Sequence, residues 1–214
     1  MNNYSLQANA VKKNFGRRLI FSNISFELIN KGIFGISGPN GSGKSTLAKI
    51  LAGLISPSGG KVIHKSNSKE ILPERLHNHI GFVSPYLILY DEFSASENFY
   101  FFARIRGITP DKNKIEDLLK RFLLFNRKED PVKTYSSGMK QRLKFIFALM
   151  HSPDLIVLDE PTSNLDEEGK ESVYKIIGEE AENKIIVIAS NEERDLSLCG
   201  NIIMLENFKL TGSR

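Results

Sequence analysis

The sequence has very little cysteine, no tryptophan and no long apolar run. Among 214 residues the one cysteine, Cys199, excludes an internal disulfide and a zinc site built from cysteines. Apolar stretches such as residues 185–189 are far shorter than the roughly 20 residues that cross a bilayer. We therefore expect no membrane-spanning helix and a structural role for Cys199.

Neither sign of charge dominates the sequence. Lys and Arg number 29 against 25 Asp and Glu, and the basic residues are scattered along the chain. This distribution lacks the basic patch that is typical of nucleic-acid-binding proteins, so we expect no nucleic acid among the partners. The first ten residues also lack the basic start and apolar stretch of a secretory signal, which predicts a cytoplasmic location.

The composition is that of one compact globular domain. Apolar residues make up 41% of the chain and charged residues 25%, and no flexible linker divides it. We expect a single α/β domain over residues 1–214, with a mostly helical subdomain inserted at approximately residues 91–150. The four histidines lack metal-ligand spacing and are assigned no chemistry: His64, His77, His79 and His151.

Apolar periodicity predicts a strand, loop and helix in the first quarter of the chain. Residues 22–28 alternate as a strand, and residues 33–37 form a short buried strand after a turn at Lys31 and Gly32. A helix is expected over residues 43–54. Its buried face is predicted to hold the regularly spaced apolar residues Leu47, Ile50, Leu51 and Leu54.

Later segments predict capped helices and buried strands. Ser94 and Glu97 have capping-box spacing before a helix that ends at Gly107, and Pro110 suits the first turn of a helix reaching about Phe125. Two continuous apolar runs, residues 155–158 and 185–189, are typical of central parallel strands covered on both faces. A helix between these strands is expected to begin at Asp166. Residues 202–205 are expected to form the last strand.

A glycine-rich loop, GPNGSGKS, occupies residues 38–45, between the expected strand and helix. It fits the pattern GxxxxGK[ST], in which backbone N–H groups surround phosphate oxygens at the start of a helix. Lys44 would pair with the β and γ phosphates of ATP, Ser45 would place its hydroxyl on Mg²⁺, and Thr46 would bond a phosphate oxygen. The predicted nucleotide-binding residues of this loop are Gly38, Pro39, Asn40, Gly41, Ser42, Gly43, Lys44, Ser45 and Thr46.

Two acidic residues follow the buried run at residues 155–158. Asp159 lies at the carboxyl end of the expected strand, where ligands of an open α/β sheet collect, and is predicted to hold Mg²⁺ through water. Glu160 is the candidate general base for an attacking water. The alternative is that both acids only cap the strand end.

Taken together, these motifs resemble the ATP-binding cassette (ABC) family over nearly the whole chain. GPNGSGKST resembles its Walker A loop, LIVLDEP its Walker B strand, SNLD at 163–166 its D-loop, and YSSGMKQR at 135–142 its signature. The resemblance implies the α/β P-loop NTPase fold. In that fold a RecA-like parallel sheet core carries an N-terminal antiparallel β subdomain and an inserted helical subdomain.

The resemblance also implies a site that two chains complete. Ser136 and Gly138 would contact the γ phosphate of ATP held by a second copy, so that a homodimer encloses two Mg-ATP. The alternative is that YSSG caps an ordinary helix, since Ser136 would cap in either case. Phe15 falls where the family stacks an aromatic ring on adenine, with a buried core position as the alternative.

Three positions depart from the family pattern. Pro85 stands where a Gln normally touches Mg²⁺ and the attacking water, and proline has no group for this contact. Asn191 stands where a His normally contacts the γ phosphate. Its carboxamide can donate a hydrogen bond to phosphate but cannot take up a proton. Ser137 replaces the first signature glycine, which is a mild change.

The function that the resemblance implies is an ATP-hydrolysing subunit of a membrane transporter, bound to a separate integral membrane permease on the cytoplasmic face of the inner membrane. Single-cassette bacterial exporter ATPases are similar, including those of the haem exporter type in cytochrome c maturation. The alternatives are a soluble cassette ATPase of a non-transport process and an ATP-gated interaction module with little turnover. The resemblance also implies that a permease docks at one aromatic-rich cluster: Tyr86, Leu87, Leu89, Tyr90 and Phe93. The alternative is that about half of these residues belong to the core.

Overall fold

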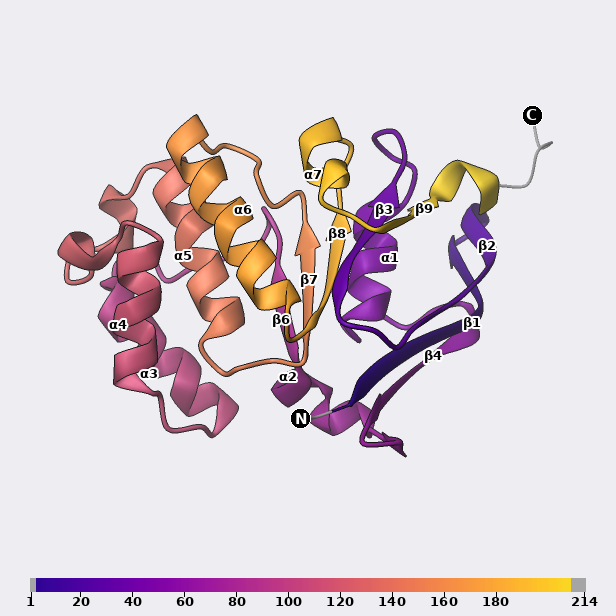
Figure 1. The fold of residues 1–214 in the computed structure, drawn as a ribbon, viewed down its shortest axis with the longest axis horizontal. Helices are drawn as coiled ribbons and strands as arrows, with labels where there is room; N and C mark the ends of the chain where they lie inside the picture. Colours follow the sequence, from indigo (N-terminus) through magenta and orange to yellow (C-terminus); the bar gives the residue numbers. More distant parts are fainter. Residues whose placement is uncertain (1–2, 209–214) are drawn as a thin grey trace.

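Two β-sheets organise the fold (Figure 1), and the computed structural model describes residues 3–208 of the chain. The antiparallel sheet has the strand order β2-β1-β4-β5, and the parallel sheet has the order β6-β7-β8-β3-β9. The antiparallel strands are β1 (Tyr4–Phe15), β2 (Arg18–Leu28), β4 (Gly59–Ser66) and β5 (Lys69–Glu70). The parallel strands are β3 (Gly32–Ser37), β6 (Ile80–Val83), β7 (Leu155–Asp159), β8 (Ile185–Ala189) and β9 (Asn201–Met204).

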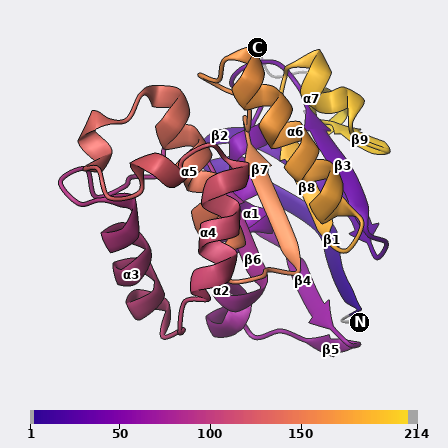
Figure 2. The same cartoon turned by 60° about the vertical axis from the view of Figure 1, so that its left-hand side comes forward.

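Helices cover both faces of the parallel sheet. The α-helices are α1 (Lys44–Leu51), α2 (Leu76–His79), α3 (Ala95–Arg106), α4 (Lys112–Arg121), α5 (Ser137–Leu149), α6 (Glu167–Ala181) and α7 (Glu193–Ser197). Short 3₁₀ turns occupy Pro73–Arg75, Phe125–Arg127, Val132–Thr134 and Leu205–Phe208. Helix α1 packs in one core with the antiparallel sheet, whereas α3 to α6 share the other core. Figure 1 shows α3 and α4 at the opposite end of the molecule from the antiparallel sheet, and the turned view of Figure 2 brings these two helices forward.

The central strands confirm the sequence prediction. Every residue of β7 and β8 is buried, and the two strands pair in parallel. Side chains alternate across the sheet, so Val157 packs in the core that contains α1 while Ile156 and Leu158 pack against α5 and α6. The α/β class, the parallel core and the N-terminal antiparallel sheet are therefore as predicted.

Helix α1 ends earlier than the predicted residue 54. Gly53 has a φ of 70°, and the Leu54 N–H donates to Lys49 O at 2.9 Å, which closes the helix in a Schellman motif. Leu54 is 57% exposed, so its predicted place on the buried face is wrong. The preceding apolar residues Leu47, Ile50 and Leu51 are buried as expected.

Helix α4 is also shorter than predicted. Asp111 caps it by accepting from the Lys114 N–H at 3.1 Å, so Pro110 precedes the cap instead of lying in the first turn. Leu123 has a φ of 59°, which ends the helix before Phe125. The predicted capping box of Ser94 and Glu97 in α3 is confirmed, as is the cap of α6 by Asp166.

The remaining boundaries shift by a few residues. Strand β2 begins at Arg18 instead of residue 22, and β9 covers Asn201–Met204 instead of 202–205. Over residues 3–208, no helix has both the length and the apolar character needed to cross a bilayer. Cys199 is partly buried and packs against the core, and burial raises the pKa of its thiol to about 11, as suits a structural cysteine.

A buried histidine predicts loss of stability in acid. His64 in β4 is 4% exposed, its Nδ1 lies 2.7 Å from the Tyr4 hydroxyl, and burial lowers its pKa to about 4. Between about pH 6.5 and pH 4 the His64 imidazole therefore takes up a proton in the unfolded chain but stays neutral in the folded one. The contribution of neutral His64 to stability is complete above this window and is lost as the pH falls through it.

We expect the free energy of unfolding of the parent to fall by about 2 kcal/mol more than that of His64→Asn between pH 7 and pH 5. Asparagine keeps an acceptor for Tyr4 but does not titrate. Urea unfolding at both pH values measures the difference, with the exposed His77→Asn as the control. Equal acid sensitivity of the parent and His64→Asn would contradict the prediction.

Candidate nucleotide-binding site

The glycine loop joins β3 to α1 and has a backbone that requires glycine. Gly43 has a φ of 108°, and a Cβ on it would lie 2.5 Å from Ile20 Cγ2. Gly43 is also the N-cap of α1, and no side chain accepts a hydrogen bond there. The first N–H groups of the helix are thus open to an anion, as the sequence pattern predicts.

Lys44 is held inside the loop. It is 5% exposed, and its Nζ donates to Gly38 O at 2.9 Å and lies 3.5 Å from Pro39 O. These carbonyl groups hold the Lys44 ammonium at the loop, and because they carry no formal charge they leave its positive charge unpaired. A buried cation at the start of α1 is suited to phosphate.

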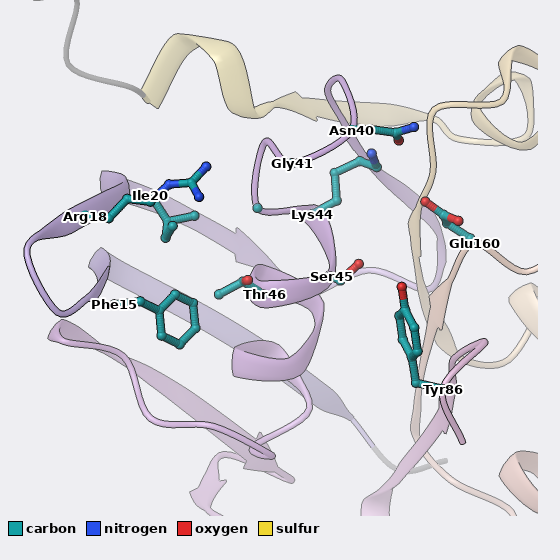
Figure 3. A pocket seen from close by; sticks show the side chains of 11 residues that line it. Phe15, Arg18, Ile20, Asn40, Gly41, Lys44, Ser45, Thr46, Tyr86 and Glu160 are labelled. Carbon is teal, nitrogen blue, oxygen red and sulfur yellow. The ribbon is translucent and has the colours of Figure 1, made fainter. Parts of the chain in front are cut away.

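A cavity of about 510 Å³ opens over this loop (Figure 3). This volume is suited to a small-molecule ligand. Its walls come from the hairpin of the antiparallel sheet, the glycine loop and the segments after β6 and β7. The lining residues are Phe15, Arg18, Ile20, Asn40, Gly41, Gly43, Lys44, Ser45, Thr46, Tyr86 and Glu160.

Phe15 is 54% exposed and forms one end of the cavity, so the alternative of a buried core position is wrong. Arg18, Ile20 and Tyr86 also line it, and the sequence analysis assigned none of them to nucleotide. Arg18 pairs with Phe15 across the β1–β2 hairpin, which brings both residues to the same end of the cavity. No local pattern in the sequence indicates this position. Tyr86 was instead grouped with the expected docking residues.

Ser45 and Asp159 come together as predicted for a metal site. Ser45 Oγ donates to Asp159 Oδ1 at 2.9 Å, while the buried Asp159 Oδ2 has no hydrogen-bond partner among the described residues. An orphaned carboxylate oxygen beside a hydroxyl fits Mg²⁺, which takes few protein ligands and completes its shell with water and phosphate. The described residues hold no cluster of three or more His, Cys, Asp or Glu that could bind a metal without phosphate.

Burial raises the pKa of the Asp159 carboxyl; Glu160 adds to this, while the Ser45 hydrogen bond and Lys49 oppose it. A raised folded-state pKa means that the charged carboxylate weakens the folded state at neutral pH, and that this penalty disappears as the pH falls toward the unfolded value near 3.8. The site is therefore less stable without a cation than with one.

Asp159→Asn should raise the free energy of unfolding of the nucleotide-free protein by about 1 kcal/mol at pH 7, because it removes the buried charge. The gain should shrink as the pH falls toward the ordinary aspartate value near 3.8, because the parent carboxyl takes up a proton more readily in the folded state than in the unfolded state. Thermal unfolding of the nucleotide-free protein at pH 7 and near pH 4 measures both effects, with the exposed Asp117→Asn as the control. A variant that is less stable than the parent at pH 7 would contradict this account.

Glu160 follows β7 in a strained conformation. Its φ is 48°, and its N–H donates to Ala189 O of the neighbouring strand at 2.8 Å. A positive φ at a non-glycine residue costs energy and concentrates at functional sites. The turn aims the carboxylate into the cavity, toward the side that holds Lys44 (Figure 3).

Asn191 lies beside the loop, outside the main cavity. Its Nδ2 is 3.4 Å from Asn40 Oδ1, and it lines a second cavity of about 170 Å³ that also includes Glu160. The turn that carries it is held by Asp195, which accepts hydrogen bonds from Ser190 Oγ at 2.7 Å and Thr162 Oγ1 at 2.9 Å. Asn191 is therefore placed next to both the loop and the carboxylate.

Ser136 and Gly138 lie apart from this cavity and line neither it nor the second one. Ser136 is exposed and caps α5 by accepting from the Met139 N–H at 3.2 Å. A Cβ on Gly138 would lie 3.1 Å from Asn164 O, so the helix start packs closely on the turn after β7. Within one chain the signature residues and the glycine loop thus form separate surfaces.

The segment at Pro85 is tied to helix α5. The buried Lys144 donates from Nζ to Pro85 O at 2.6 Å and lies 3.3 Å from Ser84 O. Of the expected docking residues, Leu89 packs against the core, while Tyr90 and Phe93 are 55% and 37% exposed. The exposed part of the segment therefore begins at Tyr86.

Comparisons with known proteins place the chain in one family. Residues 21–163 match the family described as ABC transporter. The chain is 33% identical over 211 residues to the linearmycin resistance ATP-binding protein LnrL of Bacillus subtilis, covering 94% of this chain and 66% of that protein. It is 35% identical over 187 residues to the lantibiotic transport ATP-binding protein SrtF of Streptococcus pyogenes, covering 87% and 80%.

A solved structure indicates the same family. CbiO1 of Clostridium perfringens, described as part of the ABC transporter complex cbiONQ, is 25% identical, with a TM-score of 0.77 over 94% of this chain and 84% of that one. The chain spans less than two thirds of the length of LnrL and of the uncharacterised ATP-binding protein YcbN of Bacillus subtilis, at 66% and 56%. Motifs, fold and relatives agree that the chain belongs to the ABC transporter family, as an ATP-binding domain.

Proposed function

We propose that the protein binds and hydrolyses ATP to drive a membrane transporter. The observation that carries this is one cavity in which the buried ammonium of Lys44, the Ser45 hydroxyl and the strained Glu160 carboxylate converge. Adenine would stack on Phe15, and the phosphates would follow the loop from Thr46 to Lys44. Ser45 and Asp159 would hold Mg²⁺, which supplies charge neutralisation of the phosphates.

Glu160 is the group suited to accept the proton of the attacking water. Its carboxylate faces the cavity, and the hydrogen bond to Ala189 fixes the backbone that carries it. A positioned general base contributes about 10² to 10⁴ in rate. Asn191 would contact the γ phosphate with a side chain that does not titrate, through its position beside Asn40.

The exposed start of α5 supports a site completed by a second copy. Ser136 and Ser137 face solvent, and the helix N-terminus carries a partial positive charge that suits phosphate. In an ATP-sandwich homodimer this tip would cover the nucleotide of the partner copy. The two chains would then act on a separate integral membrane permease from the cytoplasmic face of the membrane.

Affinity purification from solubilised membranes tests the transport assignment. The expected result is that the tagged chain brings down a polytopic membrane protein, and that exposed apolar residues such as Tyr90 and Phe93 are needed for this. An ATPase of a non-transport process would bring down none. An interaction module without turnover would show the same ATPase rate in the parent and in Glu160→Gln.

A further inference from the structure

Tyr86 lies in the nucleotide cavity although its backbone belongs to the segment after β6. Its side chain is 77% exposed and lines the same cavity as Lys44, Ser45 and Glu160. Figure 3 shows its hydroxyl pointing toward Ser45 and Glu160, from the side of the cavity opposite Phe15. Within residues 3–208 the hydroxyl has no hydrogen-bond partner, so it is available to a ligand.

Three contacts hold Tyr86 in this place, one to its ring and two to the backbone. The Lys49 ammonium of α1 lies 5.6 Å from the ring centroid, a cation–π distance. The Tyr86 N–H lies 3.3 Å from Ser84 Oγ, and Lys144 fixes the preceding carbonyl of Pro85 at 2.6 Å. These contacts anchor both the backbone and the ring, so the hydroxyl is aimed into the cavity while the side chain remains accessible.

The order of groups across the cavity indicates which part of ATP the hydroxyl would meet. Phe15 forms the adenine end, and the loop residues Thr46, Ser45 and Lys44 lie between it and Tyr86. A triphosphate that begins at Phe15 and follows the loop would end on the side where Tyr86 and Glu160 lie. A phenol is a hydrogen-bond donor that suits a phosphate oxygen.

We infer that the Tyr86 hydroxyl donates a hydrogen bond to the γ phosphate of ATP and is thereby a residue that distinguishes ATP from ADP. This rests on the proposed function. Pro85 leaves the preceding position without a polar side chain, and the next residue along the chain supplies the donor. The contact is absent for ADP, which lacks the terminal phosphate.

Calorimetric titration of Glu160→Gln with Mg-ATP and with ADP tests the inference, because this background does not consume ATP. Adding Tyr86→Phe should weaken ATP binding roughly ten-fold, as expected for one hydrogen bond to a charged group, and change ADP binding by less than about two-fold. Tyr90→Phe is the matched control. It removes a phenol hydroxyl from the same segment, but Tyr90 does not line the cavity.

Unchanged ATP binding in Tyr86→Phe, or an equal loss for ATP and ADP, would overturn the inference while the proposed function remains. A Glu160→Gln parent that binds no ATP would overturn both. Tyr86→Gln, which restores an amide donor, should recover part of the preference for ATP. A Tyr86→Gln variant with the same affinities as Tyr86→Phe would also count against a hydrogen bond at this place.

Discussion

Glu160→Gln should lower the rate of ATP hydrolysis at least 100-fold and leave ATP binding intact, because the amide cannot accept the proton of the attacking water. The change is nearly isosteric, and it keeps the Glu160 N–H bond to Ala189 that holds the strained turn. Steady-state phosphate release and equilibrium ATP binding measure the two effects separately.

The control for this experiment is Glu168→Gln, an exposed residue in the first turn of α6 that lines neither cavity. It should hydrolyse ATP at the parent rate. If Glu160→Gln keeps more than about a tenth of that rate, another group acts as the base and the proposed role of Glu160 is wrong. Loss of ATP binding in the same variant would indicate structural damage at the turn instead.

Lys44→Ala should abolish measurable ATP binding, with a dissociation constant at least about 100-fold larger than that of the parent. Hydrogen bonds between charged groups contribute about 1.5 to 3 kcal/mol each, and the ammonium would pair with two phosphates. Alanine also leaves Gly38 O without its 2.9 Å donor, so the loop loses an internal contact as well. Calorimetric titration with Mg-ATP measures the affinity.

Two comparisons separate the contributions at Lys44. Lys44→Arg keeps the positive charge but is bulkier in a 5% exposed position, so it should bind ATP more weakly than the parent. Lys61→Ala, an exposed lysine of β4, should bind as the parent does. ATP binding by Lys44→Ala within about ten-fold of the parent would place the phosphates elsewhere than the glycine loop.

The sequence predicts those parts of the site that depend on residues close together along the chain. The glycine pattern of residues 38–45 specifies a phosphate-binding turn, and the short apolar run before Asp159 favours a buried strand. In the structure Ser45 and Asp159 meet at the edge of the sheet, as these two patterns predict. The caps at Ser94, Ser136 and Asp166 are also local, since each side chain binds an N–H three residues on.

The parts that escaped prediction depend on how distant segments pack. Arg18 and Ile20 reach the cavity only because the antiparallel sheet folds against α1, and nothing in their neighbours along the chain indicates this. Tyr86 belongs to an aromatic-rich segment, which from sequence alone suits an interface. The helix ends at Gly53 and Leu123 were missed because apolar periodicity continues past the backbone reversal.

The most direct test of the central claim is the molar mass of Glu160→Gln in solution, measured by light scattering with and without Mg-ATP. A site completed by the exposed tip of α5 predicts a monomer of 24.1 kDa without nucleotide and a mass near twice that with Mg-ATP. Ser136→Arg, which places a bulky group at the tip, should bind ATP and stay monomeric. A Glu160→Gln protein that is saturated with Mg-ATP and remains a monomer would contradict the claim.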